Sequence, residues 1–434
     1  MPAAPPPTAP ALRTADPHHR ARVGLVIAGG FVCQLALGYG YSHGHVLNDI
    51  TAELGWSRAE FSSVRVPQLI MMSLASPLVG WGLGRIGARP ILVGSVLCLF
   101  ASSLILSRMS ELWQFGASAA FHGVVAVGLG DVVVGAIVAR WVARSRGLAL
   151  GVVFAGSNVG GWLLAQAIPR LAAEYGWRVA LLSVGTAGAA LMLPFALWVL
   201  RMPHVGEGVL DATDESPASD AGADDASADD LDLAGALRTR SFWILAYALG
   251  AFFFVFVGVL DHLVAFLRDS GLPRTDASQA LGRAVGVGLI AKPLFGAFAD
   301  RLDRRFSLWF QYGLLAVGAA GLLALPSPWW TTPVLVAFGF ATAARDVSYP
   351  LIIEHCFGPR NLAEIYGALM FLLWAGAVGS LVAGRIHDVD GSYQMVWLVF
   401  AALAGTSFLA TLFVRDERAL PRSGAPRRDR ALRG

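Results

Sequence analysis

One cation stands apart among the residues of this chain that could do chemistry. Lys292 is the only lysine in 434 residues, and it lies inside the apolar, glycine-rich run GRAVGVGLIAKPLFG. An ammonium is a compact point charge, whereas a guanidinium is a planar fork, so the two cations are not interchangeable in a binding site. An ionisable group inside an apolar run indicates function. We expect Lys292 to anchor a carboxylate, with a structural ion pair to a neighbouring aspartate as the alternative.

Two aspartates also lie inside apolar runs. Asp346 follows Arg345 in FGFATAARDVSYPLI, and Asp131 lies in GVGLGDVVVG. Adjacent residues on a helix point about 100° apart, so we expect Arg345 and Asp346 to face different neighbours. Asp346 is predicted to take up a proton or to pair with Lys292. Asp131 is the equivalent candidate in the first half, and structural pairing is the alternative for both aspartates.

Three further residues are candidates for proton coupling. His43 and His45 occur in YGYSHGHVLND, and Asp261 precedes His262 towards the end of a later apolar run. Histidine titrates near physiological pH, so the pair His43 and His45 is predicted to exchange protons, with hydrogen-bonded helix-end histidines as the alternative. For Asp261 the alternative is a hydrogen-bonded gate cluster with His262. Residues two apart on a helix diverge by about 200°, and we therefore predict no metal site.

Weaker polar candidates complete the predicted substrate-binding set: Tyr41, His122 and Asn158. For asparagine, a hydrogen bond between helices is the alternative. Glycine-rich runs occur three times, at 123–130, 156–161 and 282–288. None follows a strand, so they indicate close helix packing rather than a phosphate-binding loop. With no Ser-His-Asp arrangement, the sequence predicts neither an enzyme nor a cofactor.

Membrane-spanning helices must position these residues. The chain is 56% hydrophobic and 15% charged, whereas soluble domains carry about 25% charged residues. Roughly twelve apolar runs are long enough to cross a bilayer. We predict an all-α membrane protein with twelve transmembrane helices in two pseudo-symmetric six-helix bundles. The predicted spans are 22–47, 59–83, 90–107, 112–139, 147–169, 177–200, 241–267, 275–299, 307–325, 330–353, 364–386 and 393–414.

The chain divides into five predicted parts. Residues 1–21 form a disordered tail, 22–201 the first bundle, 202–238 an acidic linker, 239–415 the second bundle and 416–434 a basic tail. The linker contains DATDESPASDAGADDASADD, which has no large apolar residues and cannot bury enough surface to fold. A flexible connection is therefore expected, with a regulatory docking site as the alternative.

Basic residues gather in alternate short loops and predict the orientation. These loops hold Arg85, Arg89, Arg140, Arg144, Arg146, Arg301, Arg304, Arg305 and Arg360. Loops rich in arginine remain in the cytoplasm, so both tails and the linker are predicted to be cytoplasmic in a cell inner (plasma) membrane. The first 22 residues are Pro/Ala-rich and then basic, which is not the pattern of a cleavable signal peptide.

The two halves repeat each other at an offset of 216 residues. GWGLGR at 80–85 aligns with GAFADR at 296–301, RSRGLALG at 144–151 with RNLAEIYG at 360–367, and Pro77 with Pro293. Parallel duplicated bundles around a midplane site are typical of transporters.

At these loops the sequence resembles a known family. GWGLGRIGARP and GAFADRLDRRF resemble the cytoplasmic signature of the major facilitator superfamily, although Gly84 stands where the signature has the aspartate that Asp300 supplies in the second copy. GWSRAEFSS, RWVARSRGLALGVVFAGSNVGG, EYGWRVAL, FGPRNLAEIYGALM and GRIHDVDGSY look like the monocarboxylate transporter group and its oxalate/formate-type relatives.

The resemblance implies secondary transport by alternating access. In that group a cation on the eighth helix, at the place of Lys292, commonly holds the substrate carboxylate; the acidic partner found one turn earlier in some members is Gly288 here. The resemblance also implies a gate on the cytoplasmic side. The predicted gating residues are Arg85, Arg89, Asp300, Arg301 and Arg304.

The predicted function is transport of a small organic anion, similar to a monocarboxylate, with proton symport favoured over anion exchange. Efflux of a drug-like compound is an alternative, but it would predict an aromatic, acidic cavity with no need of Lys292. A transport-dead sensor would predict a folded signalling domain, which neither the tails nor the linker supplies. The expected partners are the anion, protons and the lipid bilayer, and not nucleic acid.

Overall fold

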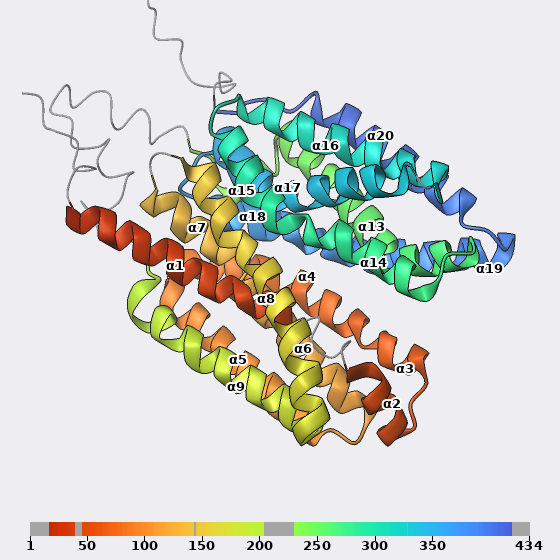
Figure 1. The fold of residues 1–434 in the computed structure, drawn as a ribbon. Helices are drawn as coiled ribbons and strands as arrows, with labels where there is room; N and C mark the ends of the chain where they lie inside the picture. Colours follow the sequence, from red (N-terminus) through yellow and green to blue (C-terminus); the bar gives the residue numbers. More distant parts are fainter. Residues whose placement is uncertain (1–16, 40–45, 143–144, 204–229, 328, 419–434) are drawn as a thin grey trace, which may run out of the picture.

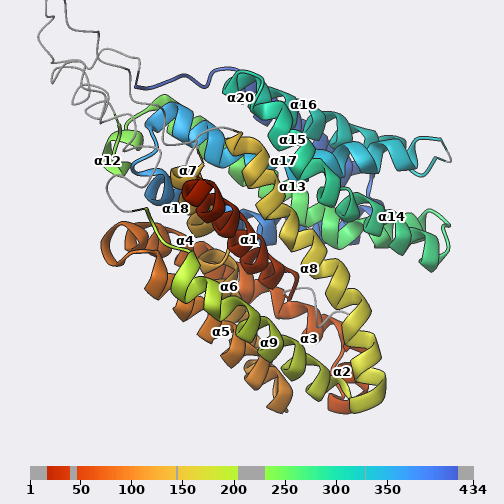
Figure 2. The same cartoon turned by 60° about the vertical axis from the view of Figure 1, so that its left-hand side comes forward.

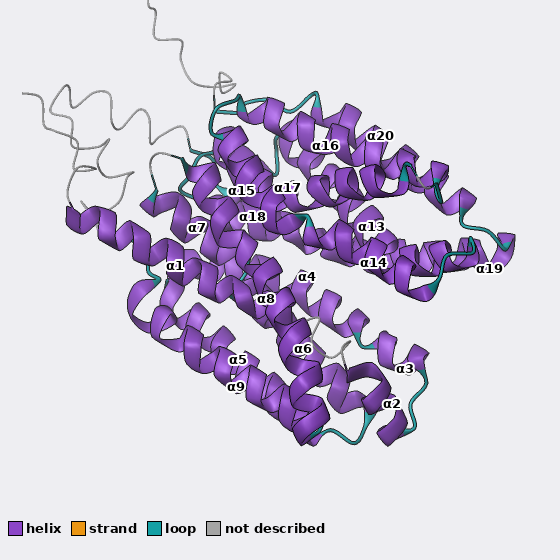
Figure 3. Ribbon diagram, in the orientation of Figure 1, coloured by secondary structure: helices purple, strands orange, loops and turns teal. Residues whose placement is uncertain are grey.

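A computed structural model describes residues 17–39, 46–142, 145–203, 230–327 and 329–418. Those residues are almost entirely helical, and they include no strand (Figure 3). The predicted site residues Tyr41, His43 and His45 lie outside the described part of the chain, as do most of both tails and most of the acidic linker.

The helices form two bundles, drawn in red to yellow-green and in green to blue (Figure 1). The first contains α1 (Pro17–Tyr39), α2 (Leu47–Leu54), α3 (Arg58–Ser63), α4 (Arg65–Ile86), α5 (Ala88–Arg108), α6 (Leu112–Gly128), α7 (Asp131–Trp141), α8 (Arg146–Tyr175) and α9 (Trp177–Pro194), which a π-helical turn extends to Val199. The second contains α12 (Leu233–Ala236), α13 (Arg240–Asp269), α14 (Arg274–Gly286), α15 (Gly288–Ala299), α16 (Arg304–Gly321), α17 (Thr331–Phe357), α18 (Leu362–Met370), α19 (Trp374–Asp390) and α20 (Gln394–Thr411).

Eleven helical segments in the described residues are long and apolar enough to cross a membrane. The α17 helix is not among them, although it is 27 residues long. Its sequence carries Arg345, Asp346 and Glu354, and these charges lower its apolar character. The predicted all-α membrane fold is confirmed. The α17 helix has the length of a membrane-spanning helix but is more polar than the eleven others.

Several spans predicted as continuous helices are interrupted. The span 112–139 is divided into α6 and α7 at Leu129 and Gly130, and Gly130 has an extended backbone (φ −93°, ψ −159°). The span 275–299 is divided into α14 and α15 at Val287, between two glycines. Glycine lowers helix stability by about 1 kcal/mol relative to alanine, which explains why the helices break at these points.

Other predicted boundaries also differ. Within the described residues, the helix predicted at 22–47 is represented by α1 (Pro17–Tyr39), and Leu47–Leu54 forms α2. The span 59–83 is α3 followed by α4, and a 3₁₀ turn at Phe371–Leu373 interrupts the span 364–386. The last part of the predicted linker is ordered, because α12 lies within it.

The described chain begins and ends at one end of the molecule, on the left in Figure 1. We call this the tail end and the opposite one the far end. At the tail end the bundles meet along two seams, α8 against α15 and α4 against α18. The α8 helix hardly contacts α14, so the halves separate towards the far end (Figures 1 and 2).

Candidate functional site: a four-charge network between the bundles

Four charged side chains form one connected network at the interface of the bundles. Lys292 Nζ on α15 lies 2.8 Å from Asp346 Oδ2 on α17. The other oxygen, Asp346 Oδ1, lies 2.8 Å from Arg345 Nη2. Arg345 Nη1 lies 3.1 Å from Asp131 Oδ2 at the start of α7. The network therefore joins the second bundle to the first.

Two cations and two anions make this network neutral. Lys292, Arg345 and Asp131 are all buried, and buried charges are tolerated only when they are paired. As expected, Arg345 and Asp346 face different neighbours, since Arg345 pairs with Asp131 and Asp346 with Lys292. They also pair with each other, which was not predicted. Backbone geometry directs only the first bonds of a side chain, and the long guanidinium reaches back to the adjacent carboxylate.

Both bundles hold the Arg345 guanidinium in place. Nη1 also donates to the Tyr366 hydroxyl on α18 at 2.9 Å. The guanidinium carbon lies 5.2 Å and 5.5 Å from the ring centroids of Phe253 and Phe252 on α13. Its Nε is buried and has no hydrogen-bond partner among the described residues. Arg345 therefore lies at the centre of the network.

Lys292 makes two more contacts, both with the first bundle. Nζ donates to the Phe154 carbonyl oxygen at 2.9 Å and to Ser157 Oγ at 2.8 Å, both on α8. An ammonium has three donors, and with Asp346 all three are used. The aspartate pair that the sequence offered as the alternative to a carboxylate anchor is present.

Local sequence explains how these side chains reach each other. The break at Gly130 makes Asp131 the first residue of α7, where the helix dipole favours a negative charge. A Cβ at Gly151 on α8 would lie 2.3 Å from the Lys292 carbonyl oxygen. Only glycine at position 151 lets α8 and α15 approach closely enough for Lys292 to reach α8.

The structure places the other described candidates elsewhere. Asn158 Nδ2 donates to the Val285 carbonyl oxygen at 3.1 Å, a contact between the bundles. His122 is buried within the first bundle beside Tyr39, with 5.8 Å between ring centroids, and lines a cavity of about 10 Å³. Asp261 Oδ1 lies 3.9 Å from Arg65 Nε and links α13 to α4.

A second group of polar contacts joins the bundles at the tail end. The backbone N–H groups of Gly147 and Leu148 donate to Asp300 Oδ1 and Oδ2, at 2.7 Å and 2.9 Å. Asp300 from the second bundle thus caps the amino end of α8 in the first. Arg304 Nη1 lies 3.7 Å from Asp300 Oδ1.

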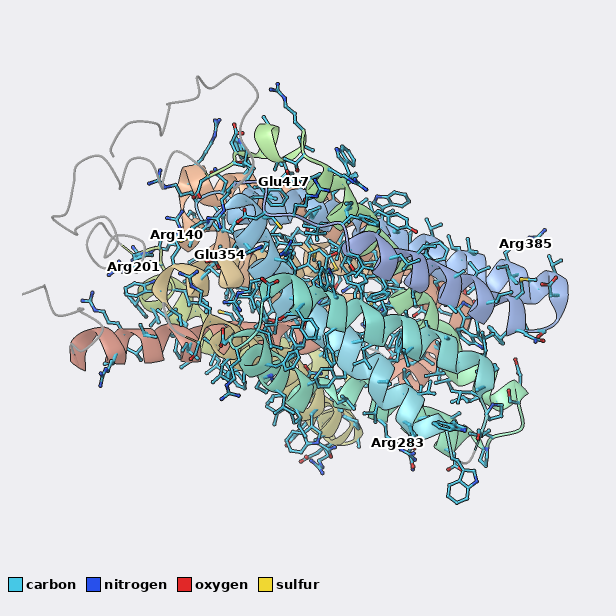
Figure 4. All side chains as sticks on the ribbon, turned by 90° about the horizontal axis from the view of Figure 1, so that it is seen from above. Arg140, Arg201, Arg283, Glu354, Arg385 and Glu417 are labelled. Carbon is cyan, nitrogen blue, oxygen red and sulfur yellow. The ribbon has the colours of Figure 1, made fainter. Side chains whose placement is uncertain are left out.

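Arginines of the first bundle add further links at the tail end. Arg146 forms an ion pair with Glu354 on α17. Arg140 Nη2 donates to the Arg360 carbonyl oxygen at 3.1 Å. Figure 4 labels Arg140 and Glu354 near this end and Arg385 at the far end.

The remaining predicted gating residues make no comparable link to another described residue. Arg85 lies over the Trp81 ring of its own helix, 4.5 Å from the centroid, and Arg89 and Arg301 are exposed.

Sequence reasoning missed some partners of the network. Ser157 precedes Asn158 in AGSNVGG, and Tyr366 lies in the conspicuous RNLAEIYG segment, so both had a weak signal. Glu354, which pairs with Arg146 at the tail end and not with the network, is an acid in an apolar run and could have been found in the same way as Asp346. The Phe154 carbonyl had no signal, because a backbone oxygen leaves no trace in the residue type.

Comparison with known sequences yields a family. The sequence model described as Major Facilitator Superfamily matches residues 30–378. Human monocarboxylate transporter 11 is 27% identical over 432 residues, covering 92% of this chain and 84% of that protein. The MFS-type transporter pytF of Aspergillus terreus is 25% identical over 291 residues, covering 65% of this chain and 91% of that protein.

Solved structures show the same fold at low sequence identity. The proton:xylose symporter XylE superposes with a TM-score of 0.70 at 15% identity, covering 92% of this chain and 97% of that one. The fucose:proton symporter FucP of E. coli superposes with a TM-score of 0.65 at 12% identity, covering 90% and 99%.

Proposed function

The chain belongs to the major facilitator superfamily, and on this premise we propose that it carries a small organic anion, similar to a monocarboxylate, by alternating access with a proton. It is a multi-pass membrane transporter and not an enzyme. One observation carries the proposal: the only lysine of the chain is buried at the bundle interface and paired with an aspartate. The names of relatives such as monocarboxylate transporter 11 support the substrate class.

Charge balance explains why the anion needs a proton. The network of two cations and two carboxylates is neutral, so an added anion would leave an uncompensated buried charge, which is costly. A proton on Asp346 Oδ2 removes that charge and releases Lys292 Nζ. The substrate carboxylate then takes the place of the aspartate, and the loaded site is neutral again.

The same balance favours symport over obligate exchange. An exchanger must not reorient when it is empty, whereas here Asp346 neutralises Lys292 in the absence of substrate. The empty carrier can therefore return. Among the other proton candidates, Asp131 pairs with Arg345 and Asp261 with Arg65. Neither pairs with Lys292, so protonating them would not release the anchor, and we propose lesser roles for them.

Orientation follows from the arginine-rich loops. We propose that the tail end faces the cytoplasm of a cell with this protein in its plasma membrane, because Arg140, Arg146, Arg301 and Arg304 lie at the helix ends and loops there. The closed seams are then the cytoplasmic gate. Asp300 at the amino end of α8 holds that gate shut.

Uptake into proteoliposomes tests the proposal with a panel of radiolabelled mono- and dicarboxylates. An inward proton gradient should drive accumulation against the substrate gradient. Lys292→Ala should abolish carboxylate binding in protein that still inserts and folds, and Lys292→Arg should retain part of it. Asp346→Asn, which mimics the protonated acid, should retain exchange and lose the proton drive.

Asp49→Asn is the matched control, since Asp49 is an exposed acid of α2. Wild-type rates for Lys292→Ala would refute the anchor. Uptake that no proton gradient can drive, with exchange intact, would replace symport with anion exchange.

A further inference from the structure

We propose that Lys292 also holds the two bundles together through its hydrogen bonds to α8, and that Ser157 is the residue that positions it. We call this link the bolt. The inference deepens the proposed function, since the same ammonium would bind the anion. It adds that the contacts of this ammonium change when the tail end opens. Ser157 would thereby connect the state of the gate to the state of the binding site.

The hydroxyl of Ser157 is arranged as an acceptor for Lys292. Ser157 Oγ donates its own hydrogen to the Phe154 carbonyl oxygen, at 2.8 Å. Its lone pairs are left for Lys292 Nζ, which also lies 2.8 Å away. The Phe154 carbonyl oxygen accepts from Nζ as well, at 2.9 Å. Two acceptors on α8 of the first bundle thus hold a cation on α15 of the second.

Burial makes this link strong. Lys292 is 5% exposed, and hydrogen bonds from an ionised donor are roughly twice as strong as neutral ones. Two other polar contacts lie in or near this seam. Asp300, at the end of α15, accepts from the amino end of α8 and is partly exposed, and the Asn158 amide donates to Val285 on α14, which is a neutral contact. Among the described residues of the seam, the contact of Lys292 Nζ with Ser157 Oγ and Phe154 O is the one that is both buried and charged.

Opening of the tail end must break this link. When α8 and α15 separate, Nζ loses its two acceptors on α8, Phe154 O and Ser157 Oγ. The two donors thus freed become available to the two oxygens of a carboxylate, and they add to the one that protonation of Asp346 releases. Anion binding and tail-end opening should therefore favour each other, and the coupling must be reciprocal because the two equilibria form one closed thermodynamic cycle.

Distances between spin labels at the tail end test the inference on full-length protein in lipid nanodiscs. Ile86 on α4 and Leu302 after α15 are exposed, lie in different bundles and make no link between them. Both would be changed to cysteine after the native cysteines are replaced. Those cysteines are Cys33, Cys98 and Cys356.

Without substrate, Ser157→Ala should raise the population with the long label distance, relative to the population with the short one, about tenfold. This change corresponds to about 1.4 kcal/mol. Ser157→Thr, which keeps the hydroxyl, should behave as wild type. Ser73→Ala is the control, because the hydroxyl of Ser73, like that of Ser157, donates to a carbonyl of its own helix, and Ser73 lies buried on α4 away from Lys292. It should leave the ratio unchanged. In a Lys292→Met background, Ser157→Ala should have no further effect.

The bolt is wrong if Ser157→Ala gives the same distances as Ser73→Ala. It is also wrong if Ser157→Thr opens the tail end as much as alanine does, since the hydroxyl would then be irrelevant. This measurement needs no substrate, so it separates the two proposals. A shift in Ser157→Ala without carboxylate transport would support the bolt and refute the proposed function, and the reverse result would refute the bolt alone.

Discussion

The two seams that close the tail end occupy equivalent positions of the duplicated halves and close by different means. In the seam of α8 and α15, a Cβ at Gly296 would lie 2.0 Å from the Gly147 carbonyl oxygen. In the seam of α4 and α18, a Cβ at Gly80, which lies 216 residues earlier, would be 2.4 Å from the Ala363 carbonyl oxygen. Both seams thus keep the glycine that allows backbone contact.

Charge is present at these positions in only one seam. Asp300 caps α8, whose own first turn has no acid. Its equivalent Gly84 contributes nothing, and α18 carries its own Glu364 in the first turn. Likewise Lys292 corresponds to Ser76, whose hydroxyl donates to Met72 of its own helix. Both seams therefore share the close approach of two backbones at a glycine. The Asp300 cap and the proposed Lys292 bolt are found only in the seam of α8 and α15.

The largest effect is expected from breaking what the seams share. Gly296→Val and Gly80→Val each place a side chain against a backbone carbonyl, and overpacking costs about 3 kcal/mol at such sites. Either change should lower uptake about 100-fold in proteoliposomes. Gly84→Ala is the control, because its Cβ would meet nothing within 4 Å. Normal uptake by one valine variant alone would show that the seams are not equivalent.

The next largest effect should come from the charge that only one seam has. Asp300→Asn weakens two charge-assisted hydrogen bonds and a favourable helix-dipole interaction. We expect turnover to fall about tenfold, or about 1.4 kcal/mol, while KM changes less than about twofold. Initial rates over a range of substrate concentrations separate the two. An increase in KM at constant turnover would remove Asp300 from the gate.

A smaller effect should follow from giving the other seam the missing acid. Gly84→Asp enters open space and can accept from the amino end of α18, which stabilises by about 0.5–1 kcal/mol. The open tail-end population should fall about two- to fivefold in the same spin-label experiment. Glu364 already lies in that turn, which limits the gain. Gly84→Asn, without the charge, should give a weaker shift, and an equal shift would exclude the charge as its cause.

The smallest effect is expected far from either seam. Arg178 donates to Glu53 at 2.9 Å and 3.1 Å, and Trp177 donates at 2.6 Å. The hydrogen bonds from Arg178, and then the one from Trp177, lower the pKa of Glu53. This stabilisation is present above the ordinary glutamate pKa of about 4.3 and is lost as the pH falls through the lowered value in the folded protein.

Glu53→Gln should therefore lower the free energy of unfolding at pH 7 by less than about 1 kcal/mol, as for other exposed ion pairs. The difference from wild type should disappear in acid, and the tail-end distances should not change. Thermal unfolding followed at several pH values measures this. A difference that persists below the folded pKa would contradict the electrostatic explanation.

The sequence predicted the fold well because its signals are long and repeated. Apolar runs and the 216-residue offset identify two bundles without any knowledge of contacts. The four charged residues of the network were all noticed, since a charge in an apolar run is conspicuous. Three of them were proposed as site residues, and Arg345 was treated only as the neighbour of Asp346.

Contacts that depend on tertiary geometry could not be predicted. The pairing of Arg345 with Asp346 was missed, because helix periodicity describes where Cβ points and not where a long guanidinium ends. The glycine runs were interpreted as packing surfaces, and two of them also contain helix breaks, at Gly130 and beside Val287. Composition alone does not distinguish a glycine that packs from one that ends a helix.

The charges of α17 have a consequence for how the protein is made. Each charged residue at the centre of a helix raises the free energy of membrane insertion by about 2.5–3.5 kcal/mol, so α17 is poorly suited to enter lipid alone. Asp131 and Lys292 precede α17 in the chain, so we expect their helices to enter the membrane before Arg345 and Asp346 do. The ion pairs of α17 with Lys292 and Asp131 can then form during its insertion and lower the cost of burying its charges. Biogenesis of the second bundle depends on the first, and the order of synthesis is part of what makes α17 a transmembrane helix.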